Sequence, residues 1–183
     1  MVATTRPETI FGDTAVAVNP NDKRYKKLVG KKLIVPLVNR VVPIIGDKSV
    51  DSEFGTGCLK VTPAHSEKDF EIGIRNNLDI IDIFNEDASL NDYGMHYKSL
   101  DRFSVRKKII TELDEKGLLD RADDYTHKIA LSERTSCVVE PKLSTQWFVR
   151  MKKLSNPALD LVLNGDIQFY PKKYVKTYKN WLE

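Results

Sequence analysis

The feature that most constrains this chain is a series of short β-prone runs, each cut off within a few residues. The first run, Thr14–Val18, ends at Asn19–Asp22, which offers turn residues and a helix N-cap. Three further runs, Lys32–Leu37, Arg40–Ile45 and Cys58–Thr62, each contain or meet a proline. Because proline has no N–H to donate to a β-ladder, we expect short strands that lie at edges or carry bulges.

Helical patterns follow these runs. Ser66–Asn76 begins with a capping serine and acidic residues in the first turn, and Ser104–Glu115 has an apolar stripe and a following glycine. A short basic helix is expected at Lys23–Val29 and a further strand at Ile80–Phe84. Since strands outnumber helices and no regular crossover helices separate them, we predict a mixed α/β fold. Its core would be a mostly antiparallel β-barrel with surrounding helices.

Beyond about Lys128 the periodicity weakens. Short elements are expected at Leu143–Met151 and Asn156–Leu163. The stretch Tyr170–Trp181 then interleaves lysines with aromatic residues. It is typical either of a surface for phosphates and bases, or of a solvated lysine face beside aromatic residues that a larger protein buries. The formal net charge of +3 gives only weak support to nucleic-acid binding.

Composition sets the class of protein. With 183 residues, 41% of them hydrophobic, the chain can bury one real core. The longest apolar run, Leu33–Val38, is too short to cross a bilayer, and Met1–Arg6 has no apolar signal-peptide region. The two cysteines, Cys58 and Cys137, could form a disulfide, but free thiols in a reducing cytoplasm fit better. We therefore predict a cytoplasmic protein that does not associate with membranes.

The first segment with chemical potential is Thr4–Thr9, which places three threonines and Arg6 around a proline. Hydroxyls and backbone amides in an irregular turn can hold a ribose or phosphate, and an arginine can pair with an oxyanion. Taken alone, however, the pattern is more typical of a polar loop.

The second segment is Phe54–Asp69. Strand alternation predicts that Lys60 and Thr62 lie on one face, and a proline then ends the strand. His65 follows at the entry to a helix whose first turn carries Asp69. A cation, a hydroxyl, an imidazole and a carboxylate at one corner can bind an amine, polarise a carbonyl and position a water. Each residue alone also has an ordinary structural explanation, so their contiguity carries the functional interpretation.

Both segments resemble motifs of a known family. Ala3–Thr9, followed by Gly12–Val18, resembles the threonine-rich opening of the editing domain inserted in class I valyl-, isoleucyl- and leucyl-tRNA synthetases. Gly55–His65 is similar to the second motif in its valyl form. The resemblance covers essentially the whole chain, and it extends to four shorter segments: Leu100–Phe103, Val138–Pro141, Gln146–Val149 and Trp181-Leu182.

The resemblance implies a fold with a β-barrel core and a hydrolytic function. The expected substrate is threonine wrongly esterified to the 3′ end of valine tRNA, and the nucleophile is a positioned water. Residues 1–150 would form the editing domain, and residues 151–183 would lead back to the synthetic domain. Because the HIGH and KMSKS motifs of that domain are absent, we expect no ATP chemistry and no tRNA charging here. Met1 is interpreted as the start of a segment excised from a longer protein, and the fragment as a monomer without a cofactor.

The resemblance also implies roles for single residues. The ester and the terminal adenosine would be lined by Thr4, Thr5, Arg6 and Thr9, with Phe54 near the adenine or the pocket wall. Lys60 and Thr62 would contact the ester and the substrate side chain, Asp69 the α-amino group, and His65 would help to position them.

Two departures from the family pattern matter. Ser66 stands where aspartate is usual, so rate or threonine selectivity could differ, although Ser66 remains a candidate for contacting the threonine hydroxyl with Lys60 and Thr62. Ser132 and Thr135 replace a cysteine pair found in some members, so no zinc site is expected. The alternatives are an isoleucyl- or leucyl-type editing domain and a tRNA-binding module without activity.

Overall fold

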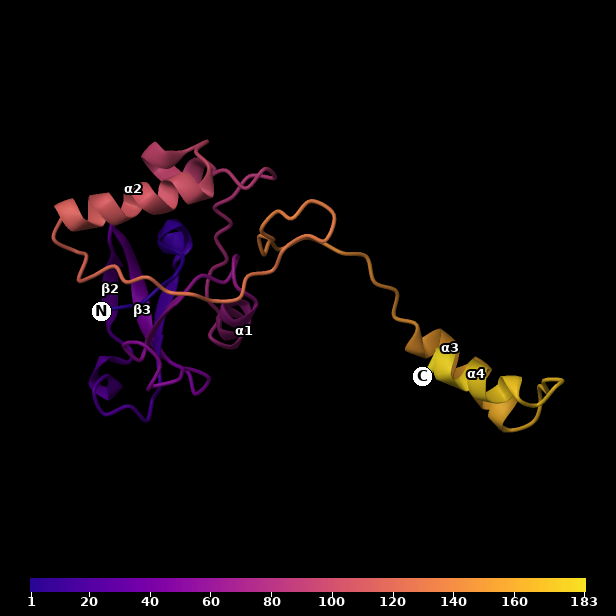
Figure 1. The fold of residues 1–183 in the computed structure, drawn as a ribbon. Coiled ribbons are helices and arrows are strands. Elements are labelled where there is room, and N and C mark those ends of the chain that lie inside the picture. The colour runs from indigo at the N-terminus through magenta and orange to yellow at the C-terminus, as the bar shows by residue number, and fades with distance from the viewer. The chain divides into compact units, whose positions relative to one another are not determined.

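The computed structural model describes residues 1–183 and divides them into two compact units, Met1–Leu143 and Ser144–Glu183 (Figure 1). The sequence predicted a domain boundary after residue 150, and the two units divide after Leu143. Unit 1 contains a sheet and most of the buried core, and unit 2 contains two helices.

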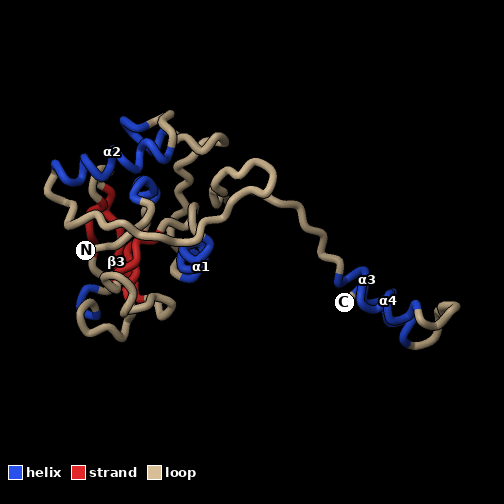
Figure 2. The backbone as a smooth tube through the Cα atoms, in the orientation of Figure 1, coloured by secondary structure: helices blue, strands red, loops and turns tan.

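Unit 1 is built on a four-stranded sheet of order β2-β3-β1-β4, drawn red in Figure 2. The strands are β1 (Ala15–Val18), β2 (Lys32–Val35), β3 (Arg40–Gly46) and β4 (Cys58–Val61). β1 pairs in parallel with β3, and the β1–β4 and β2–β3 pairings are antiparallel. The mixed α/β class is therefore confirmed.

The predicted β-barrel is wrong, because the sheet is open and β2 and β4 are its two edges. Four strands are too few to close around a filled interior, for which about eight are usual. The segment Ile80–Phe84, expected to add a strand, is extended chain that makes only the isolated bridge Phe84↔Leu90. Its backbone is instead used in local contacts with the following turn.

β3 contains Pro43 and lies inside the sheet, although its proline predicted an edge strand. The pairing of β3 explains how this is possible. β3 pairs with β2 through Arg40–Pro43 and with β1 only from Ile44 onward. Pro43 thus lies at the point where one ladder ends and the other begins, so its missing N–H interrupts neither.

Local signals set the helices of unit 1. In α1 (Glu67–Arg75) the cap is Ser66, whose Oγ accepts a hydrogen bond from the Asp69 N–H, as predicted. α2 (Arg102–Glu115) begins two residues earlier than expected, because Asp101 and not Ser104 accepts from the first free N–H groups. Three 3₁₀ helices complete the unit: η1 (Pro7–Gly12), η2 (Lys26–Leu28) and η3 (Asp92–Tyr97).

Two apolar clusters form the core of unit 1. The larger one joins η1, η3 and α2 and consists of Phe11, Ile83, Phe84, Leu90, Tyr97, Val105 and Ile109. The smaller one packs the sheet against α1 and consists of Ala15, Ala17, Val50, Val61 and Ile72. Since η1 leads directly into β1, the two clusters fix the path of the chain between them.

Unit 2 contains α3 (Lys152–Leu163) and α4 (Tyr174–Leu182), which pack against each other. The element expected at Leu143–Met151 is absent, and that segment is extended up to the turn at Met151. Large side chains within this segment are almost fully exposed, among them Trp147 and Phe148. In neither unit is any helix both long and apolar enough to span a bilayer.

The first prediction concerns the larger cluster. Ile109→Ala should lower the free energy of unfolding by about 2–5 kcal/mol, because Ile109 is fully buried and its removal leaves a cavity. Ile74→Ala in α1 is the matched control, since Ile74 is 62% exposed and should change stability by less than about 0.5 kcal/mol. Urea denaturation of the two variants measures the difference, and equal losses would contradict the assigned core.

Candidate functional site

The two predicted segments meet because β1 and β4 are neighbours in the sheet. Their antiparallel register pairs Ala15 with Val61 and Val16 with Lys60, and the Thr14 N–H donates to the Val61 carbonyl over 3.0 Å. The residues that precede β1 therefore lie beside the end of β4. Gly12 makes this approach possible, since a Cβ there would come within 3.0 Å of the Thr62 methyl group.

Lys60 is the centre of the resulting polar cluster. Its ammonium group donates to Thr9 Oγ1 over 2.6 Å, to Asp13 Oδ1 over 2.9 Å and to the Thr62 hydroxyl. Thr62 Oγ1 in turn donates to Asp13 Oδ1 over 2.7 Å. All three ammonium protons are thus used, as a largely buried lysine requires. The prediction that Lys60 and Thr62 share a face is confirmed.

Asp69 joins this cluster from the first turn of α1. Its Oδ2 accepts from the Thr62 N–H over 2.9 Å, and the Ser66 side chain also hydrogen-bonds to the carboxylate. Burial raises the pKa of Asp69 and that of Asp13 above the ordinary carboxyl value, and Lys60 opposes the shift at both. The corner therefore contains a carboxylate that can pair with a cation.

His65 holds a structural position. It is 1% exposed, its Nε2 accepts from the Ile83 N–H over 3.0 Å, and its Nδ1 lies 3.4 Å from the Pro141 carbonyl oxygen. These partners place the proton on Nδ1 and leave neither nitrogen for a water. Burial lowers the pKa of His65 to about 4. This placement gives His65 a structural role, whereas the part in positioning substrate groups that the resemblance implies stays a prediction.

Arg6 connects the N-terminal segment to the same corner. Its Nη1 donates to the His65 carbonyl over 3.0 Å, and its Nη2 forms an ion pair with Glu140. The neighbouring Thr4 and Thr5 are exposed, and Thr4 Oγ1 accepts from the Arg6 N–H over 3.0 Å.

The structure does not bring Phe54 into the polar cluster. Phe54 is 69% exposed in the loop before β4, and a Cβ on the next residue, Gly55, would lie 3.3 Å from the Ala3 methyl group. The loop therefore lies beside the N-terminal segment. Ser66 is used as the α1 cap, at 3.3 Å from the Asp69 nitrogen.

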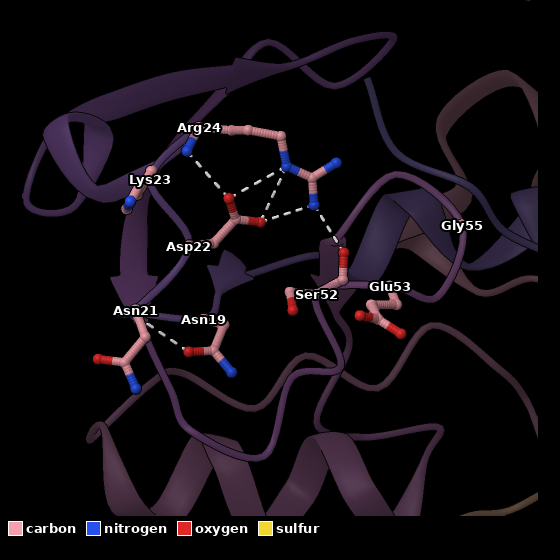
Figure 3. A pocket seen from close by; sticks show the side chains of 8 residues that line it. All are labelled: Asn19, Asn21, Asp22, Lys23, Arg24, Ser52, Glu53 and Gly55. Carbon is pink, nitrogen blue, oxygen red and sulfur yellow. Dashed lines mark hydrogen bonds and ion pairs between the residues drawn. The ribbon is translucent and has the colours of Figure 1, made fainter.

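A shallow groove of about 610 Å³ lies at the other end of β1 and β4 (Figure 3). It is polar, and Figure 3 shows Asp22 paired with Arg24, whose Nη2 also donates to the Ser52 carbonyl. Its lining contains none of the cluster residues and consists of Asn19, Asn21, Asp22, Lys23, Arg24, Ser52, Glu53 and Gly55. The groove and the Lys60 cluster are therefore separate features.

Comparison with known proteins decides the family. A model of the tRNA synthetases class I (I, L, M and V) matches residues 13–183. The chain belongs to this synthetase family. Over its whole length it is similar to the valine–tRNA ligases of Christiangramia forsetii (57% identical), Porphyromonas gingivalis (55%) and Thermotoga maritima (52%). The resemblance to valyl members of the class I synthetases is thereby confirmed.

The match covers 100% of this chain and 21% of each of those ligases, so the chain spans about a fifth of their length. Among solved structures, a chain of the Agrobacterium radiobacter K84 agnB2 LeuRS-tRNA-LeuAMS ternary complex matches 62% of this chain and 16% of its own. Its TM-score is 0.47 and its identity 23%.

Sequence reasoning missed three acids that this synthetase segment places around the site. Asp13 accepts from both Lys60 and Thr62, and Glu8 and Glu140 flank Arg6. Asp13 lies inside the quoted opening motif, beside a β-prone run, and that position was the only available signal. Glu8 and Glu140 also lie inside quoted segments, but the pairings of Glu8 with Arg106 and of Glu140 with Arg6 join residues that are remote in the sequence.

The buried histidine predicts a pH dependence. The folded-state pKa of about 4 lies below the unfolded value of 6.5, so the unfolded state binds the proton first as the pH falls. Stability should therefore fall between pH 6.5 and 4, by at most about 3 kcal/mol. His65→Gln retains a donor and an acceptor but does not titrate.

Urea denaturation of both proteins at several pH values in this window measures the effect. The wild-type loss should exceed that of His65→Gln. In both proteins the raised pKa values of Asp13 and Asp69 act in the opposite direction, so the difference isolates His65. Parallel pH profiles would show that His65 is protonated as readily in the folded state as in the unfolded chain.

Proposed function

We propose that unit 1 hydrolyses the ester of threonine wrongly attached to the 3′ end of valine tRNA, as an editing site within a valine–tRNA ligase. The observation that carries this proposal is the convergence of Lys60, Thr62 and Asp69 with the N-terminal segment. The similarity to valine–tRNA ligases supports the choice of valine tRNA as the substrate. Activation of valine with ATP would belong to the parts of such an enzyme outside this chain.

Asp69 supplies the first recognition element. A free amino group distinguishes an aminoacyl ester from most other esters, and it is a cation at neutral pH. The Asp69 carboxylate can accept a charge-assisted hydrogen bond from it through Oδ1, while Oδ2 stays on the Thr62 N–H. This contact would fix the α-carbon and present the ester carbonyl to the rest of the corner.

Lys60 supplies electrostatic stabilisation. When water attacks the ester carbonyl, negative charge develops on its oxygen, and the attacking water loses a proton that the departing ribose hydroxyl gains. The bond between the carbonyl carbon and the ribose oxygen breaks, which releases threonine and tRNA. An ammonium group held in a largely buried cluster stabilises that charge better than it would in water. Arg6, Thr4 and Thr5 would contact the terminal nucleotide.

Selectivity for threonine needs a group that hydrogen-bonds its hydroxyl. A site of this kind rejects an analogue that lacks the hydroxyl by ~10⁴–10⁵, because buried polar groups are then left unpaired. Thr62, with Lys60 and Asp13 beside it, is the proposed contact. Ser66 is a weaker candidate, because its Oγ already caps α1.

Deacylation of threonyl-tRNA by the chain is the direct test. The wild-type chain should release threonine above the buffer rate and act more slowly on valyl-tRNA. Asp69→Asn should lower the rate by about 10²-fold, because the amide does not pair with the ammonium group. The control is Glu67→Gln, which removes an exposed carboxylate from the same helical turn. An unchanged rate in Asp69→Asn, with an active wild type, would show that this corner is not the active site, whereas an inactive wild type would favour a tRNA-binding module.

Asp13→Asn tests the support of Lys60. The amide keeps the shape but removes the charge opposite the ammonium group, so the deacylation rate should fall at least about tenfold. Unfolding free energy should fall by about 1–3 kcal/mol, because two hydrogen bonds to a charged acceptor are weakened. Asp79→Asn, at an exposed position without an ion pair, is the control for both assays. An unchanged deacylation rate in Asp13→Asn would show that Asp13 does not contribute to the site.

A further inference from the structure

Five charged side chains form an alternating ladder behind the N-terminal segment. Arg106 donates to both carboxylate oxygens of Glu8, over 2.8 and 2.6 Å. Glu8 lies 3.4 Å from Arg6, Arg6 pairs with Glu140, and Glu140 lies 3.3 Å from Arg102. The ladder thus joins η1, α2 and the residue at position 140, and Arg6 is its middle member.

Burial distinguishes this ladder from ordinary surface ion pairs. The side chain of Glu8 is fully buried and that of Glu140 is 13% exposed, so both carboxylates are shielded from water. Arg6 donates through all three of its nitrogens, to Glu8, the His65 carbonyl and Glu140. A guanidinium held at three points has one orientation, and each acceptor contributes to setting it.

Glu140 lies in the middle of residues 138–142, which we call the strap. Both ends of the strap are bound to the rest of unit 1. On one side Arg102 donates to the Val138 carbonyl over 3.0 Å. On the other side Lys142 donates to the Phe84 carbonyl over 3.2 Å and lies 3.5 Å from Asp82. Pro141, directly after Glu140, restricts the backbone between the two anchors.

We propose that Glu140 is a positioning residue of the editing site, which acts by orienting Arg6 toward the terminal nucleotide. The inference rests on the proposed function. Arg6 carries the segment with it, because its N–H donates to Thr4 Oγ1 and its carbonyl accepts from the Thr9 hydroxyl. Without the Glu140 charge, Arg6 would keep only the His65 carbonyl and the Glu8 carboxylate. It shares that carboxylate with Arg106. The loss of the Glu140 charge should therefore weaken substrate binding and leave the chemical step unchanged, because Lys60 and Asp69 do not touch the strap.

The test is steady-state deacylation by Glu140→Gln in the full chain. We expect KM for threonyl-tRNA to rise about tenfold while kcat changes less than twofold, because an orienting contact is lost and the chemistry is not. Glu140→Asp, which keeps the charge on a shorter side chain, should restore part of the affinity. Glu133→Gln is the matched control, since it removes an exposed carboxylate from the turn before the strap and should leave both constants unchanged.

A binding measurement separates positioning from a merely structural role. The probe is adenosine carrying threonine through a 3′ amide, which cannot be hydrolysed by the ester reaction. Its Kd should rise about tenfold in Glu140→Gln, with the circular dichroism spectrum and the His65 pH dependence unchanged. A reduced kcat with unaltered KM and Kd would overturn the inference, as would an affinity loss that appears only with loss of the folded spectrum. If the wild type neither binds the probe nor hydrolyses the ester, the proposed function fails and this inference with it.

Discussion

The contact between Lys60 and Asp13 is the interaction on which the arrangement of unit 1 depends. A lysine inside a protein is tolerated only when its charge is compensated and its donors are satisfied. Asp13 compensates the charge, and Thr9, Asp13 and Thr62 accept the three protons; the approach of Thr9 and Asp13 requires the β1–β4 register observed here. A shift of one residue would turn Lys60 to the opposite face and into the apolar cluster beneath α1. The polar cluster and the sheet register therefore specify each other.

A second network extends this order to the loops. Arg6 donates to the His65 carbonyl, and the His65 ring accepts from the Ile83 N–H, beside the larger apolar cluster. The imidazole also stacks edge-on against Phe84, with 4.7 Å between ring centroids. A neutral, buried histidine thus links the ion-pair ladder to the hydrophobic core. The lowered pKa of His65 is a consequence of its burial, and the His65 carbonyl helps to hold Arg6 at the candidate site.

What could be predicted from the sequence was local. Ser66 as the α1 cap and the common face of Lys60 and Thr62 follow from periodicities over a few residues, and both are observed. The barrel was wrong because closure depends on pairings between remote strands, and Ile80–Phe84 has strand composition without a strand partner. The ladder was missed for the same reason: Arg6 and Glu140 are 134 residues apart, and no periodicity over a few residues predicts that they meet. The family resemblance pointed to the candidate site, whereas the contacts of its supporting acids required coordinates.

Lys60 has no free proton, and this affects how an editing site would discriminate threonine from valine. All three of its protons are bound to protein oxygens, and the Thr62 hydroxyl is both donor and acceptor within the cluster. A substrate that contacts this group must displace one of those bonds. Threonine can return a hydrogen bond through its hydroxyl, while valine would leave a buried polar group unpaired, at a cost of about 1–3 kcal/mol for each group. Under the proposed function, selectivity would thus arise from a network that is complete without substrate and that only a hydroxyl-bearing side chain can enter without loss.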